Sequence, residues 1–200
     1  MTTQHGFLAR SAAYFVLSTV LVYSAPAQQQ PAPSSDAAPA GTPAAVDPKA
    51  HEAAGRLATA IGLKEKMAAQ IDTMLAQGVA AMKSQFPNIR PEFADEWTRR
   101  MKARMNPDDF VAIFVRVYEK YFTAEELDQL TDAANQSKEG KTPVLSDALK
   151  EKYQKNAATA QSEIVSGATQ LGAKLGSEVG EEIANEHPDW APTPAPKSDK

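Results

Sequence analysis

The apolar positions of the chain recur about every three to four residues, the spacing of helices that bury one face. Two-residue alternation is not sustained anywhere in the sequence, and it lacks the Asn-Gly and Asp-Gly pairs of tight hairpins. The pattern predicts an all-α fold, an irregular bundle of six or seven helices. The clearest apolar stripes are Met67–Ile71–Leu75–Val79–Met82, Phe93–Trp97–Met101–Met105 and Leu171–Leu175–Val179–Ile183.

One segment, DDFVAIFVRVYEKYF, is apolar on most of its circumference. Phe110, Phe114 and Val117 lie on one side of the expected helix, and Val111 and Val115 lie on another. A helix of this kind is usually buried at the centre of its domain.

Helix boundaries are indicated by capping residues that precede a proline. Asp47-Pro48, Asn106-Pro107 and Thr142-Pro143 each place a capping side chain before Pro at the first helical position. Ser166-Gly167 predicts a break or bend in the last long helix, because Gly disfavours helix interiors.

The stretch YFTAEEL predicts a corner between two helices. Thr123 and Glu126 have the spacing of a capping box, in which each side chain satisfies the backbone amide of the other residue. Phe122 and Leu127 flank that box in the positions of a hydrophobic staple, which fixes the angle between the two helices. Gly140 is expected to end the second helix with positive φ.

The same stretch resembles a family of exported bacterial proteins, the domain-of-unknown-function family numbered twenty fifty-nine. The resemblance is good over 117–141 and loose over 67–183. It departs at Ala133-Ala134, where the family has an aromatic pair, at Lys138 in place of a proline, and in a spacing one residue longer. The resemblance implies an all-helical exported domain and supplies no catalytic or binding residues. The matching positions are Tyr118, Phe122, Thr123, Glu126, Leu127, Ser137 and Gly140.

The first 27 residues have the pattern of a secretory signal peptide. Arg10 precedes an apolar run over 11–22, and small residues follow, so we expect cleavage after Ala27, with Ser24 as the second choice. The apolar run is too short for a membrane span of about 20 residues. We therefore expect a periplasmic or secreted protein with no transmembrane span after cleavage.

The composition divides the rest of the chain into a folded domain and two polar ends. Residues 28–47 are rich in Pro and Ala, and 188–200 have a similar composition. Segments this poor in bulky apolar residues are typical of disorder, so we expect a disordered linker and a disordered tail. Residues 48–187 form the predicted helical domain.

Charge and composition exclude several classes of function. The formal net charge is −4, which argues against nucleic-acid binding. The chain has no cysteine, which excludes disulfides, thiolate metal sites and a cysteine nucleophile. His51 lacks the second histidine of a zinc-protease motif, and His187 is far from it along the chain. We expect no cofactor, no metal and no enzyme activity.

Two features are candidates for an interaction surface. Arg99, Arg100 and Arg104 lie opposite the apolar stripe of their helix, which is typical of a solvated face and would also suit an acidic partner or an anionic lipid. Gly172, Gly176 and Gly180 follow a four-residue step along the last helix. They favour close helix packing, either within the chain or between protomers.

The sequence leaves three functions open. The first is a non-enzymatic module that binds an envelope protein, with its partner and oligomeric state undetermined. The alternative is a carrier of a small ligand or lipid, with an apolar cavity among the Met and aromatic residues of 67–121. A hydrolase is the least favoured, because no catalytic motif is present.

Overall fold

The computed structural model describes residues 47–190, and within that range the regular structure is helical. This confirms the predicted all-α bundle, with six α-helices in the described part. They are α2 (Pro48–Ala60), α3 (Leu63–Gln85), α4 (Pro91–Arg104), α5 (Pro107–Tyr121), α6 (Ala124–Lys138) and α7 (Asp147–Glu186), followed by the 3-10 helix η1 (Pro188–Trp190).

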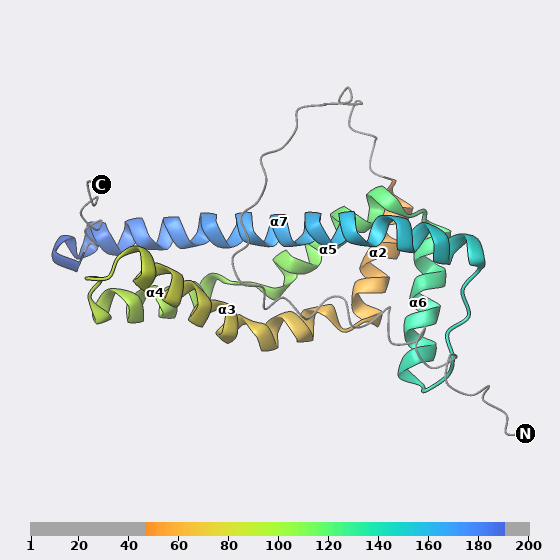
Figure 1. The fold of residues 1–200 in the computed structure, drawn as a ribbon, viewed down its shortest axis with the longest axis horizontal. Helices are drawn as coiled ribbons and strands as arrows, with labels where there is room; N and C mark the ends of the chain where they lie inside the picture. The colour runs from red at the N-terminus through yellow and green to blue at the C-terminus, as the bar shows by residue number, and fades with distance from the viewer. Residues whose placement is uncertain (1–46, 191–200) are drawn as a thin grey trace, which may run out of the picture.

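The long helix α7 runs the length of the molecule (Figure 1). Its 40 residues extend over roughly 60 Å at 1.5 Å per residue. Helices α2 and α6 lie across it at one end, and at the other end α4 packs against it and α3 packs against α4 (Figure 1). Helix α5 contacts α2, α3 and α7, as its nearly all-round apolar surface predicts.

Two core clusters lie along α7, one at each end. Met67 packs against both clusters, so α3 joins them. The first core cluster comes mainly from α2, α5 and α6, and includes Leu57, Leu63, Phe114, Val115, Phe122, Leu127, Leu130 and Leu149. The second core cluster comes from α3, α4, α5 and α7, and includes Ile71, Leu75, Ile89, Phe93, Trp97, Met101, Met105, Phe110, Val179 and Ile183.

Small side chains let α2 and α6 approach closely. Ala53 and Ala54 of α2 are fully buried, and Ala133 and Ala134 of α6 are nearly so. Ala133 and Ala134 therefore have a packing role, because α6 packs closely against α2.

Two of the three predicted helix starts are confirmed. The Asp47 side chain accepts a hydrogen bond from the Lys49 amide, and the Asn106 side chain accepts one from the Asp108 amide, both at 3.0 Å. The start at Thr142-Pro143 is wrong. Helix α7 begins at Asp147 instead, where Ser146 Oγ accepts from the Leu149 amide at 3.3 Å.

The break predicted at Ser166-Gly167 is also wrong, because α7 continues through it. A Cβ atom on Gly167 would stand 2.9 Å from Cγ2 of Ile113. The glycine therefore makes room for a side chain of α5, and that contact explains its presence inside a helix.

The folded part extends slightly beyond the predicted boundary at residue 187. Residues Pro188–Trp190 form η1, the His187 and Trp190 rings stack at 3.9 Å, and Trp190 packs against the second core cluster. The expected signal peptide, residues 28–46 of the expected linker and the tail from 191 lie outside the described residues. No helix within 47–190 has the length and apolarity of a membrane span.

Candidate functional site

The helix corner has the geometry that the sequence predicts. Thr123 Oγ1 accepts from the Glu126 amide at 3.3 Å, and Glu126 Oε2 accepts from the Thr123 amide at 2.8 Å, which completes the capping box. Phe122 and Leu127 are both buried in the first core cluster, as a hydrophobic staple requires. Gly140 follows α6 with φ of +73°.

A partner from α7 completes this corner, and no local sequence pattern indicates it. Lys152 Nζ lies 2.6 Å from Glu126 Oε2 and 5.7 Å from the centre of the Phe122 ring. Partial burial acts to raise the pKa of Glu126, but hydrogen bonds from Lys152 and the Thr123 amide outweigh it and hold that pKa below its usual range. The corner therefore anchors α7 to the α5–α6 junction.

The aromatic side chains of the corner form a stacked row. Phe114 stacks on Tyr118 at 4.0 Å between ring centres, Tyr118 lies 5.6 Å from Phe122, and Phe122 lies 6.1 Å from Tyr153. Burial raises the pKa of Tyr118, and the neighbouring Tyr153 phenol adds to that shift. A phenol held neutral among aromatic rings serves packing, so these residues have a structural role.

The basic cluster of α4, which consists of Arg99, Arg100 and Arg104, forms ion pairs with acidic residues of the same chain. Arg100 contacts Glu96 at 2.6 Å and also pairs with Glu186, while Arg104 pairs with Glu182 at 2.6 Å. Hydrogen bonds from Arg99 and Arg100 lower the pKa of Glu96 to about 2. These pairs tie α4 to the last turns of α7, and they leave little of the cluster's charge for an acidic partner.

The three glycines of α7 differ in what they face. A Cβ atom on Gly176 would lie 3.4 Å from Cζ2 of Trp97, and one on Gly180 would lie 4.0 Å from Phe93. A Cβ atom on Gly172 would meet nothing within 4 Å. Gly176 and Gly180 therefore admit α4 side chains, which is packing within the chain, whereas Gly172 faces open space.

Trp97 is held between two helices by glycines. Its Nε1 donates to the Gly176 carbonyl oxygen at 3.1 Å, and a Cβ atom on Gly78 would come within 2.9 Å of its Cη2. The indole is 7 % exposed and belongs to the second core cluster. It forms one wall of the largest hollow described below.

That hollow is an apolar groove between α3, α4 and α7, with a volume of about 530 Å³. Four of the six methionines of the chain line it, and none of its lining residues is charged. Its polar side chains are Gln85 and Ser177. We call it the methionine groove, and its lining residues are Met74, Leu75, Gly78, Ala81, Met82, Gln85, Phe86, Trp97, Met101, Met105, Gly172, Ala173, Gly176 and Ser177.

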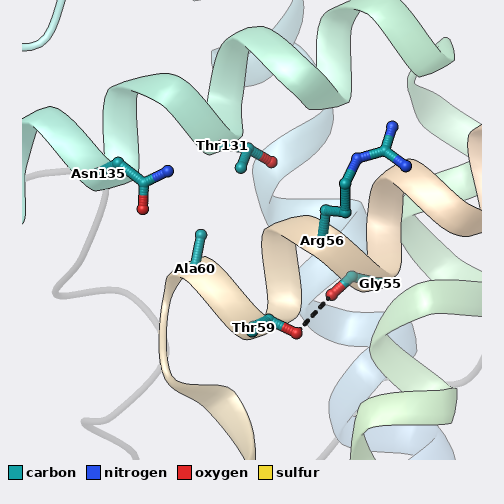
Figure 2. A pocket seen from close by; sticks show the side chains of 6 residues that line it. All are labelled: Gly55, Arg56, Thr59, Ala60, Thr131 and Asn135. Carbon is teal, nitrogen blue, oxygen red and sulfur yellow. Dashed lines mark hydrogen bonds between the residues drawn. The ribbon is translucent and has the colours of Figure 1, made fainter.

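A second hollow, of about 440 Å³, is shallow and lies between α2 and α6. In Figure 2, Arg56 and Ala60 of α2 point toward α6, which carries Thr131 and Asn135, whereas the Thr59 hydroxyl turns to Gly55. The Thr59 hydroxyl is hydrogen-bonded to the Gly55 carbonyl at 3.0 Å, and Arg56 pairs with Asp128 at 2.7 Å. Thr59, Thr131 and Arg56 of this hollow are therefore bonded within the chain.

A third hollow, of about 220 Å³, lies between α5 and α7. Glu163 in its wall pairs with Lys120 at 2.8 Å and accepts from the Tyr121 hydroxyl. Among residues 47–190, no group of three or more His, Asp or Glu side chains is placed to hold a metal ion.

The methionine groove overlaps the region in which the sequence suggests an apolar cavity, and the carrier function stays a prediction. The expected apolar cavity lay within 67–121, which covers the α3 and α4 walls. The α7 wall was missed, because Gly172 and Ala173 give no signal that distinguishes a groove wall from a packed helix face.

Comparisons of the chain with protein-family models, curated proteins and solved structures gave no match. The resemblance to the family numbered twenty fifty-nine therefore stays a prediction from the helix-corner residues.

Proposed function

We propose that the protein is an exported, non-enzymatic carrier that binds a small apolar molecule in the methionine groove. The observation that supports this most directly is the uncharged lining of a groove of about 530 Å³. Small-molecule sites are typically mostly apolar hollows of about 300–1,000 Å³ with a few polar groups. Export is proposed from the signal pattern in residues 1–27 and from the family resemblance.

The contacts within the chain favour a carrier over the protein-interaction module. The surface expected for such a module consisted of the basic cluster and the three glycines. The arginines pair with Glu96, Glu182 and Glu186, and Gly176 and Gly180 are covered by α4 side chains. The interaction module stays a prediction, and no described contact adds support to it.

Co-purification tests the carrier function. The protein is isolated from the periplasmic or secreted fraction of its own producing cells, and its native mass is compared with that of a solvent-extracted and refolded sample. We expect a bound species of small mass in the native sample and a higher melting temperature than in the extracted one. Identical masses and melting curves in the two samples would contradict the proposal.

Export has a separate test. The intact mass of the same preparation should correspond to a chain that begins at Gln28, since we expect cleavage after Ala27. A mass that retains residues 1–27 would contradict signal cleavage and leave the groove proposal unchanged.

A further inference from the structure

We infer that the ligand of the methionine groove is a neutral amphiphile with a single hydrocarbon chain, an inference that rests on the proposed carrier function. Three properties of the groove support it: its shape, its lack of charge and the unpacked surface of Gly172.

The shape of the groove fits one extended chain. Its α3 wall runs from Met74 to Phe86, which corresponds to roughly 18 Å along a helix axis. A volume of about 530 Å³ over that length describes an elongated channel, and an α-helix of the same length, roughly 10–12 Å in diameter with its side chains, would need a larger volume. A polymethylene chain therefore fits better than a helical peptide.

The lining offers no counter-charge to a charged ligand group. Within the described residues, no charged side chain lines the groove. Lys102 of α4 and Asp72 of α3 form an ion pair with each other at 2.6 Å. A carboxylate or ammonium buried there would lose its hydration without gaining a counter-charge. The carboxamide of Gln85 makes no hydrogen bond to another described residue and can donate to or accept from a neutral head group.

Gly172 supplies the third observation. Glycine is disfavoured inside helices, and Gly167 and Gly176 each leave room for a side chain of another helix. Gly172 has no neighbour within 4 Å of its built Cβ and lines the groove. Its missing side chain thus widens the groove, whose flexible methionines can adjust to a chain of methylene groups.

Quenching of Trp97 fluorescence tests the ligand class. The chain has two tryptophans, so Trp190→Phe leaves Trp97 as the single reporter in the groove wall. The protein is extracted with solvent, refolded and titrated with 12-bromododecan-1-ol, 12-bromododecanoate and the matching trimethylammonium salt, at about pH 8 where the acid is ionised. We expect saturable quenching by the alcohol, relieved by dodecan-1-ol, with both charged probes binding about 10-fold or more weakly.

Two leucine substitutions locate the site. Gly172→Leu places a side chain in the groove and should weaken binding of the alcohol about 10-fold or more. Gly55→Leu is the matched control, because Gly55 also has no neighbour within 4 Å of its built Cβ but lines the separate hollow between α2 and α6. Ala173→Leu is a second blocking variant, and it serves if Gly172→Leu does not fold.

The outcomes separate this inference from the carrier function. If a charged probe binds as tightly as the alcohol or more tightly, and Gly172→Leu abolishes that binding, the inference of a neutral ligand is overturned and the carrier function is supported. Binding that is unchanged in both blocking variants would overturn the groove as the site. If no probe binds, the inference fails, and the co-purified mass then decides the carrier function by itself.

Discussion

The indole Nε1 of Trp97 in α4 donates a 3.1 Å hydrogen bond to the carbonyl oxygen of Gly176 in α7. The other edge of the same ring lies against Gly78 of α3. Trp97 of α4 thus contacts α3 and α7 at positions where both helices have a glycine. The methionine groove takes its shape from this arrangement, because the ring, Gly78 and Gly176 all line it.

Glycine-to-alanine substitutions at Gly78 and Gly172 should have opposite effects on stability. An added methyl group at Gly78 would stand 2.9 Å from the buried Trp97 ring, and overpacking typically costs about 1–3 kcal/mol. At Gly172 the methyl group meets open space, so the higher helix propensity of Ala should add about 0.5–1 kcal/mol. Urea unfolding measures both, and a stabilising Gly78→Ala would contradict the placement of the ring.

Thr123→Ala should lower the free energy of unfolding by about 1 kcal/mol through loss of the α6 cap. Thr169 of α7 provides the control, because its hydroxyl bonds to the Val165 carbonyl inside a helix and is exposed. Thr169→Ala should be neutral or slightly stabilising. Equal effects of the two substitutions in urea unfolding would mean that the capping box contributes nothing.

Acid should weaken the ion pairs that Glu96 makes with Arg99 and Arg100 within α4. The folded-state pKa of Glu96 is about 2, below its ordinary value of 4.5, because Arg99 and Arg100 donate to it. The folded state therefore binds fewer protons than the unfolded state, and the contribution of Glu96 is present above about pH 4.5 and lost as the pH falls towards 2. Unfolding midpoints at a series of pH values should show a shallower acid decline in Glu96→Gln.

The control for this measurement is Glu52→Gln, since Glu52 forms no ion pair within residues 47–190. It should keep the wild-type decline. An unchanged pH profile in Glu96→Gln would mean that the arginine pairs do not stabilise the fold.

His51→Ala should destabilise the junction of α2 and α5. His51 Nδ1 lies 2.7 Å from Glu119 Oε2, and the Glu119 side chain is only 9 % exposed. Removing the imidazole leaves a mostly buried carboxylate without that hydrogen bond, which costs about 1–3 kcal/mol. Lys49→Ala on the same helix is the control, and thermal unfolding that ranks the two variants equally would contradict a role for this pair.

Local signals in the sequence predicted the helix corner well, because a capping box and a staple depend on residues a few positions apart. The same kind of signal failed at Thr142-Pro143, where Val144 stays outside the helix and its amide donates to Gln136 at 3.1 Å. Ser146 is the residue that caps α7. A threonine before a proline indicates that a helix can begin there, but whether the helix does begin there depends on the path of the loop.

Contacts between distant segments explain what the sequence could not predict. Gly167 suggests a bend until Ile113 is seen to occupy the space beside it. The stripe of Arg99, Arg100 and Arg104 suggests a basic surface until the acids of α7 are placed opposite it. The groove depends on which helices are neighbours. Apolar periodicity predicts which face of a helix is buried, but it does not predict which helix packs against that face.

The order in which α7 appears during synthesis has a consequence for the nascent chain. Leu149 of α7 completes the first core cluster, but Val179 and Ile183 complete the second from near the end of the same helix. Until those last turns leave the ribosome, Trp97 and the apolar faces of α3 and α4 lack their cover. The second core cluster is therefore complete only after residues 179–183 have been made, and a chain cut short before them would leave apolar side chains of α3 and α4 uncovered, which favours aggregation.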